Sequence, residues 1–255
     1  MFKGRNIYNM RISILMQHTR CERIFLVSIL LLILIISGIS CSKDFMTSGK
    51  ATDESRLSVT GVKTLGNLHM HTTCSDGKNT YEEMVQKALS LNFRFISITD
   101  HKFGGSSLCD AVISQCLAEK RLLCIPGMEV TGKVHLLGIG IQSKIDERLS
   151  VKKQVEEIHK QGGLAIAAHP FRRGNTYTDE ELLETGLDAV ECRDIPANKK
   201  KEFYAKLKEH NIPCAYNSDA HNTTRLIQTW NSCDGEIKSI DELKKALKAG
   251  RCGER

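Results

Sequence analysis

The sequence predicts an α/β protein in which strands and helices alternate along the chain and the strands form a barrel. The first observation is that apolar, strand-like runs alternate with helix-like segments over residues 61–255, with short connections between them. The second is that histidines and carboxylates gather where the strand-like runs end, which is the edge at which barrel strands converge. The third is that the sequence has neither a Gly-x-Gly-x-x-Gly after a first strand nor a P-loop, which disfavours a nucleotide-cofactor fold.

Seven strand-like runs are expected in this region, each rich in apolar residues. They cover residues 62–69, 95–99, 122–126, 134–141, 164–168, 189–192 and 213–217. Seven strands with helices between them indicate a barrel related to the eight-stranded form, distorted or one unit short.

Six helices are expected between and after these strands. Three of them begin at capping boxes, in which a hydroxyl lies three residues before a carboxylate: Thr80 with Glu83, Thr178 with Glu181, and Ser239 with Glu242. The other three are expected over residues 108–120, 150–161 and 197–210. Together these elements fill about 195 residues, a size that suits one domain.

The first 60 residues differ from the rest in composition. A basic start is followed by an uncharged stretch rich in Leu and Ile from Ile24 to Ser40, and Cys41 comes next. This pattern resembles a bacterial lipoprotein signal with Cys41 lipidated, and the alternative is an uncleaved membrane anchor. We therefore expect a signal peptide or anchor over residues 1–40, a flexible tether over 41–60 and the folded domain over 61–255. The expected location is the bacterial cell envelope, as a membrane-anchored lipoprotein in the periplasm or at the cell surface.

Charge and cysteine content narrow the class of protein further. The formal net charge is +6, but residues 1–40 hold five Lys or Arg and one Glu, so the remainder carries +2. Charge alone therefore predicts no stable nucleic-acid partner. Eight cysteines lie in the domain and none forms a Cys-x-x-Cys, which disfavours a structural zinc knot. Cys124 and Cys214 are expected as small core residues, and the sequence does not decide between free thiols and disulfides.

Five of the nine histidines fall into four short blocks, three of which also contain a carboxylate. The blocks are His69-Met70-His71 with Asp76, Asp100-His101, Ala168-His169-Pro170 and Ser218-Asp219-Ala220-His221, and Glu129 and His135 lie between the second and the third. Imidazole and carboxylate groups suit Zn, Mn and Fe. One ion in a catalytic site takes about three or four protein ligands, so nine such side chains predict two or three ions that share bridging carboxylates.

Each block taken alone is weak evidence, because His-x-His and Asp-His pairs occur by chance. Their placement carries the argument, since each block follows a strand-like run and would lie on the same face of a barrel. The other three histidines, His18, His159 and His210, lie in the leader or in helix-like segments and are expected to have no role in a site.

Taken together, these segments resemble the motifs of the polymerase and histidinol phosphatase (PHP) family. The matching segments are Asn67-Leu68-His69-Met70-His71-Thr72-Thr73-Cys74-Ser75-Asp76-Gly77, Ile98-Thr99-Asp100-His101, Gly127-Met128-Glu129, His135-Leu136-Leu137-Gly138, Ala168-His169-Pro170-Phe171-Arg172 and Ser218-Asp219-Ala220-His221. The resemblance covers essentially the whole domain. It implies a distorted (βα)7 TIM-like barrel with a phosphoesterase site of two or three divalent ions.

The resemblance also implies roles for individual residues. It assigns one ion to His69, His71, Glu129 and Asp219. It assigns a second ion to Asp76, His101 and His169. His135 and His221 complete the cluster, and Glu129 is the expected bridge. Asp100 is expected to orient a ligand histidine from outside the cluster.

The implied activity is hydrolysis of a phosphate monoester, of a small molecule or a nucleotide, by metal-activated hydroxide. Arg172 follows His169-Pro170 at the spacing of several small family members, and Arg193 follows a predicted strand, so both are expected to bind the phosphate. Lys102 and Arg225 are weaker candidates for this role. Two alternatives stay open: a 5′-to-3′ exonuclease or oligonucleotide phosphodiesterase, and a membrane-tethered metal-binding module without catalysis.

Overall fold

The computed structural model describes residues 61–255, so the expected leader, Cys41 and the tether lie outside the described residues. Seven strands match the seven expected runs: β1 (Lys63–Asn67), β2 (Phe93–Ile98), β3 (Leu123–Thr131), β4 (His135–Ile139), β5 (Leu164–Ala167), β6 (Ala189–Glu191) and β7 (Cys214–Ala215). Two further strands, β8 (Asn231–Asp234) and β9 (Cys252–Glu254), were not expected from the sequence. Among the described residues, no helix has the length and apolar character needed to span a membrane.

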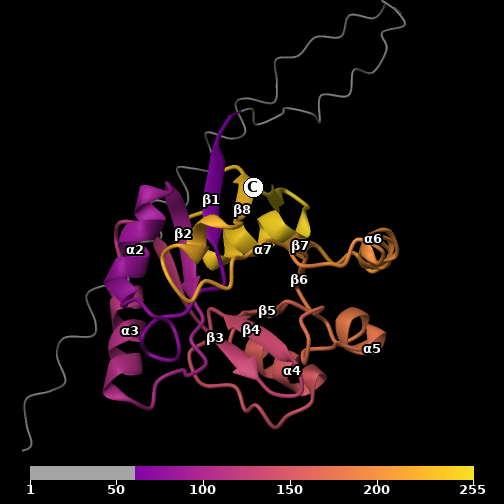
Figure 1. Cartoon of the computed structure of the whole chain (residues 1–255), viewed down its shortest axis with the longest axis horizontal. Coiled ribbons are helices and arrows are strands. Elements are labelled where there is room, and N and C mark those ends of the chain that lie inside the picture. The colour runs from indigo at the N-terminus through magenta and orange to yellow at the C-terminus, as the bar shows by residue number, and fades with distance from the viewer. Residues whose placement is uncertain (1–60) are drawn as a thin grey trace, which may run out of the picture. The chain divides into compact units, whose positions relative to one another are not determined.

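All nine strands belong to one sheet, which curves into a nearly closed barrel (Figure 1). Their order is β7-β6-β5-β4-β3-β2-β1-β8-β9, so from β1 to β7 each strand lies beside the next one in the chain. The fold is therefore the expected α/β barrel, with more strands than the seven that the sequence predicts. The two additional strands pair with each other and extend the sheet at the free edge of β1.

One part of the barrel departs from repeated βα units. β4 is antiparallel to both of its neighbours, β3 and β5, whereas the pairs β1–β2, β2–β3, β5–β6 and β6–β7 are parallel. The reason is local, because only residues 132–134 separate β3 from β4 and a parallel crossover needs a dozen residues or more. The start of β4 therefore lies at the same rim of the barrel as the end of β3.

The helices begin at or close to the residues that the sequence predicts. They are α2 (Tyr81–Ser90), α3 (Ser107–Ala118), α4 (Val151–Lys160), α5 (Asp179–Leu183), α6 (Lys200–Glu209) and α7 (Ile240–Lys248), with a 3-10 turn, η1 (Arg225–Ile227). Thr80 and Thr178 form complete capping boxes with the glutamates three residues on. Ser239 caps α7, but the Glu242 carboxylate accepts from the backbone N–H of Lys238 instead of closing the box.

The core lies inside the barrel and between the barrel and its helices. Leu68, Phe95, Leu137 and Ile166 are fully buried and belong to one cluster, which Leu243 of α7 joins. Burying side chains of this size is worth roughly 1.5–3 kcal/mol each, so this packing holds the strand ends in place. Many of the residues buried near those ends are polar, among them His69, Thr99 and His169, which marks the rim as a candidate site.

The cysteines are all paired in the described part of the chain. The four disulfides are Cys74–Cys109, Cys116–Cys124, Cys192–Cys214 and Cys233–Cys252. The sequence leaves open whether the domain cysteines are free thiols or disulfides, and the structure has them as disulfides. Cys124 and Cys214, expected as core residues, are buried and half-buried and belong to two of these disulfides.

Candidate metal centre

The predicted ligand residues converge at one rim of the barrel. His69 and His71 follow β1, His101 follows β2 and His169 follows β5. Glu129 lies in β3, His135 begins the antiparallel β4, and Asp219 and His221 follow β7. The structure thus brings all nine side chains together, with Asp76 on the loop after His71. The hydrophobic strands fix where the side chains emerge, as expected for an α/β barrel.

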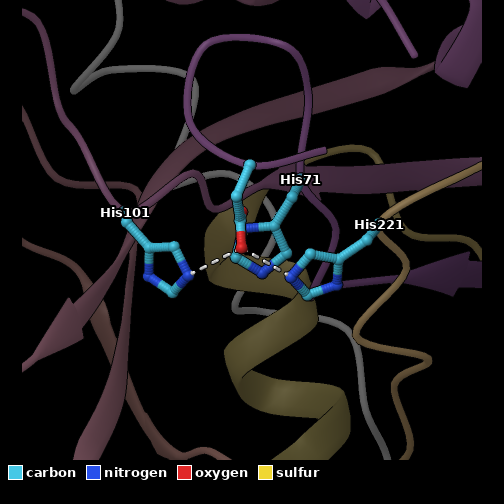
Figure 2. A group of neighbouring side chains, drawn as sticks. His71, His101 and His221 are labelled. Atoms are coloured by element: carbon cyan, nitrogen blue, oxygen red, sulfur yellow. Dashed lines mark hydrogen bonds and ion pairs between the residues drawn. The ribbon is translucent and has the colours of Figure 1, made fainter. Parts of the chain in front are cut away.

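The nine side chains form three overlapping groups, and within each group the candidate ligand atoms lie within 4.8 Å of one another. The groups are His71, Asp76, His101 and His221; His69, His71, Glu129 and Asp219; and Glu129, His135 and His169. In the first group, Asp76 Oδ2 lies 3.0 Å from His221 Nε2 and 3.6 Å from His101 Nε2. Figure 2 shows the His101 and His221 rings approaching from opposite sides, with His71 between them.

The second group, His69, His71, Glu129 and Asp219, is the set that the family resemblance assigns to one ion. The position of His169 differs from the one that the resemblance implies. His169 lies with Glu129 and His135 instead of with Asp76 and His101, and His221 takes its place beside those two. The strand order explains the difference. β5 neighbours β4, so His169 emerges beside His135, while Asp76 and His101 emerge from the loops after β1 and β2.

The buried carboxylate of Glu129 joins two of the groups. Its Oε1 lies 2.8 Å from His135 Nδ1 and 2.9 Å from His169 Nε2. Its Oε2 lies 3.1 Å from the Nε2 atoms of both His69 and His71. Each oxygen therefore faces a different set of imidazoles, which is the arrangement of a bridging carboxylate.

Buried polar atoms at the centre of the cluster lack hydrogen bonds. Both ring nitrogens of His71 and both carboxylate oxygens of Asp219 are buried without such a partner. His71 Nε2 nevertheless lies 3.2 Å from Asp219 Oδ1, so the atoms are close but not aimed at each other as donor and acceptor. Leaving such groups unsatisfied costs about 1–3 kcal/mol each. A cation between them would satisfy imidazole and carboxylate lone pairs together, so these residues fit a metal ion.

The charges of the cluster also favour a cation. Burial lowers the pKa of His69, but the carboxylates of Glu129, Glu191 and Asp219 outweigh burial and raise that pKa well above its usual value. For His71, burial again lowers the pKa, but the nearby carboxylates of Asp219 and Glu129 outweigh it and raise the pKa to about 8. The neighbouring imidazoles in turn hold the pKa of Glu129 well below its ordinary range, against the effect of burial. Metal binding by these groups is therefore expected to release protons.

Asp100 does not orient a ligand histidine, which corrects the expectation from the sequence. Its carboxylate accepts hydrogen bonds from the Thr72 backbone N–H at 2.8 Å and the Thr72 hydroxyl at 2.7 Å. The Ser75 hydroxyl donates a third bond, at 2.6 Å. Because its acceptors are directed to the chain after His71, Asp100 shapes the loop that carries Asp76.

Three residues that support the ligands were not identified from the sequence. The Glu191 carboxylate lies 2.9 Å from His69 Nδ1, and the Thr131 hydroxyl lies 2.8 Å from His101 Nδ1. Asn175 accepts from the His135 backbone N–H and donates to the Ala168 carbonyl. Glu191 ends a strand-like run as the ligands do, but no histidine stands beside it, so a search for histidine blocks passes over it. Thr131 and Asn175 carry no signal of metal binding in their residue type.

The two arginines expected to bind phosphate have different surroundings. Arg172 Nη2 lies 2.5 Å from Asp219 Oδ2, and 40% of the Arg172 side chain is exposed, so it borders the cluster and remains open to solvent. Arg193 donates from Nη1 to the Ser218 carbonyl at 2.6 Å and from Nε and Nη2 to Asp194. Most of its donors thus already have partners. Of the two weaker candidates, Lys102 directly follows His101, and Arg225 begins η1.

The chain is similar in sequence or in fold to several known proteins. The DNA polymerase/3′-5′ exonuclease PolX of Bacillus subtilis is 23% identical over 221 residues, which is 72% of this chain and 39% of that protein. The phosphoribosyl 1,2-cyclic phosphate 1,2-diphosphodiesterase of Eggerthella lenta is 22% identical over 181 residues, 68% of this chain and 65% of that protein. A crystal structure from Bacteroides vulgatus, of a two-domain protein containing a predicted PHP-like metal-dependent phosphoesterase, superposes with a TM-score of 0.61 at 20% identity. It covers 76% of this chain and 65% of that one.

The fold and the cluster together define a barrel protein with a candidate centre for several metal ions at one rim. The PHP domain family matches residues 67–250, and the chain belongs to that family. The chain spans less than two thirds of the length of each of the three proteins compared above.

Proposed function

We propose that this protein hydrolyses a phosphate monoester, of a small molecule or of a nucleotide, with two or three divalent ions of Zn, Mn or Fe. The observation that carries the proposal is the set of three overlapping ligand groups, two of which share Glu129. Nine side chains exceed the needs of one ion, and the unsatisfied buried atoms of His71 and Asp219 lie in the group that shares a residue with each of the other two.

The chain's own residues would divide the work. Bound ions would supply a water of lowered pKa as nucleophile and neutralise charge on the phosphoryl oxygens. Arg172, half open to solvent beside Asp219, is placed to hold a phosphate oxygen through its guanidinium. The buried carboxylates of Glu129 and Asp219 would fix the imidazoles that surround them and give the cluster its negative charge.

The proposal makes a stoichiometric prediction. Purified protein reconstituted with Zn or Mn should carry at least two ions per chain by elemental analysis, and chelation should abolish phosphoesterase activity. Re-adding the metal should restore that activity. One ion or none after reconstitution would contradict the shared site, whatever the activity.

A phosphodiesterase or exonuclease is the second candidate, because one relative is named as a 3′-5′ exonuclease and another as a diphosphodiesterase. The two candidates differ in the substrate that they turn over. We expect mononucleotides or other monoesters to be hydrolysed faster than single-stranded oligonucleotides of matched 5′ sequence. The reverse preference would favour the nuclease. A protein that binds metal but turns over neither would be a metal-binding module without catalysis.

We propose further that the protein acts in the bacterial cell envelope, held at the membrane through Cys41 or an uncleaved anchor. The support is the leader pattern together with the four disulfides, since disulfides persist in oxidising compartments such as the periplasm. Replacing Cys41 by Ser should block lipidation and cleavage, so that the precursor keeps its leader. Protein isolated from the envelope without reductant should show no free thiol among the eight domain cysteines, and a soluble mature form of the Ser variant would count against lipidation.

A further inference from the structure

Glu191 lies outside the three ligand groups and yet contacts two of them. It ends β6, is 3% exposed and has three hydrogen bonds to its carboxylate. Oε1 accepts from the His69 ring and, at 3.0 Å, from the Asn217 side-chain amide. Oε2 accepts from the backbone N–H of His169 at 2.8 Å. One buried carboxylate is therefore bound to a ligand ring and to the backbone of another ligand.

The contact with His69 decides which ring nitrogen can face a metal. Glu191 Oε1 lies 2.9 Å from Nδ1, while Nε2 lies 3.1 Å from Glu129 Oε2 and 3.2 Å from Asp219 Oδ1. An ionised carboxylate only accepts, so it keeps the proton on Nδ1. The lone pair of the neutral ring is then left on Nε2, toward the ligand group.

The contact with His169 acts on the backbone instead of on the ring. His169 has a φ of 27°, close to the left-handed region that residues with a Cβ seldom adopt. Such a conformation persists only where the surroundings impose it. The bond from its N–H to Glu191 is one of those restraints, and it directs the His169 ring toward Glu129.

We infer that Glu191 is a positioning residue that sets the His69 tautomer and the His169 backbone together, and so fixes two ligand groups relative to each other. The inference rests on metal binding by the cluster, which is part of the proposed function. It does not require that the protein hydrolyse any particular substrate.

The test replaces Glu191 by Gln, which keeps the size of the side chain. The amide offers one acceptor oxygen where the carboxylate offers two, so it cannot accept from both the His69 ring and the His169 N–H. Zn²⁺ affinity, measured by competition with a chelator, should fall about 10- to 100-fold, the usual loss when an outer partner of a ligand histidine is removed. In metal-free protein, the downfield NMR signal of the His69 Nδ1 proton should move upfield, because its acceptor has lost its charge.

Asp188→Asn is a matched control outside the cluster. Asp188 also accepts from a histidine ring, His159 Nε2 at 2.8 Å, and from a backbone N–H, that of Ala165 at 2.8 Å. This variant should lose stability without losing Zn²⁺ affinity.

Two outcomes would overturn the inference. One is an unchanged Zn²⁺ affinity in Glu191→Gln, and the other is a loss no larger than in the Asp188 control. If Glu191→Gln does not fold, the wild-type spectrum decides, since a His69 ring whose Nδ1 lacks a proton in the Zn-loaded protein would also contradict it. A wild type that binds Zn²⁺ but hydrolyses no phosphoester would refute the proposed function while leaving this inference standing.

Discussion

Two of the candidate ligands, His169 and Asp219, have backbones with positive φ, of 27° and 50°. Four non-glycine residues have positive φ in the described part of the chain, and the other two, Asn92 and Asn211, are of the type that tolerates it best. Strain of this kind persists where packing and hydrogen bonds impose it, and it concentrates at functional sites. The backbone geometry of these two positions therefore points to a functional site, as their side-chain chemistry does.

Replacing either residue by Ala should abolish turnover and leave a folded domain. The Ala variants keep the backbone but remove an imidazole or a carboxylate from a ligand group, so the loss should exceed the roughly 10- to 100-fold typical of an outer partner. Steady-state kinetics at saturating metal and circular dichroism would measure the two effects. A variant with near wild-type kcat would remove that residue from the ligand set.

Arg172→Lys should lower kcat/KM while metal content stays whole. Lysine keeps the charge but loses the planar fork that pairs with two phosphate oxygens. A bond to a charged group is worth about 1.5–3 kcal/mol, or roughly ten- to a hundredfold in kcat/KM. Arg193→Lys is the comparison variant, and we expect the smaller effect there because Ser218 and Asp194 already occupy its donors. Equal kcat/KM in wild type and both variants would show that other groups hold the phosphate.

At the scale of single residues, the sequence shows which residue types could bind a metal, but it does not show which atoms they contact. The sequence predicts all nine side chains that converge in the cluster, because imidazole and carboxylate beside a strand end are rare enough to be informative. Glu191, Thr131 and Asn175 were not found, since their roles depend on which ring nitrogen or backbone group they meet. The role of Asp100 was wrong for the same reason, as its partners follow from the path of the loop after His71.

The elements were predicted best where local chemistry defines them. Thr80 and Thr178 begin helices as capping boxes predict, because the cap satisfies free N–H groups within four residues. β8 was missed because Asn231-Ser232-Cys233-Asp234 has no apolar run, and it is a strand only through pairing with β1 and β9. β9 depends on tertiary pairing in the same way. The antiparallel direction of β4 follows from the short link after β3.

The disulfide Cys74–Cys109 joins the loop that carries Asp76 to the first turn of α3. Replacing both cysteines by Ser should cost about 2–4 kcal/mol of unfolding free energy and weaken metal binding by the group that contains Asp76. Denaturant unfolding and metal titration would measure these effects.

The control is the double Ser variant of Cys116 and Cys124, whose disulfide closes a shorter loop away from the ligands. It should lose stability but keep full metal content. Equal metal binding in both double variants would show that the first disulfide has no part in placing Asp76.

At the scale of the whole molecule, the four disulfides all join residues that are close in the chain. Their sequence separations are 35, 8, 22 and 19 residues. The contact between β1 and the C-terminal part of the domain instead joins residues that are far apart in the chain. There β1 pairs with β8, and the Leu68 N–H donates to the Asn217 side chain across 149 residues. Asn67 adds bonds to Ser218 and to the Thr229 carbonyl.

This seam, where residues 63–68 meet residues 217–234, thus has no covalent link among the described residues, and it closes the longest loop described here. Closing a loop costs more entropy as the loop lengthens, so the seam is where the barrel should open first under partial denaturation. His69 and His71 lie on one side of it, and Asp219 and His221 on the other. Opening would therefore divide the ligand groups that contain them, whereas Glu129, His135 and His169 would stay together on one side. An ion bound across the seam would link its two sides, as a disulfide does elsewhere in the domain. The free energy of unfolding of the whole barrel would then depend on its metal content.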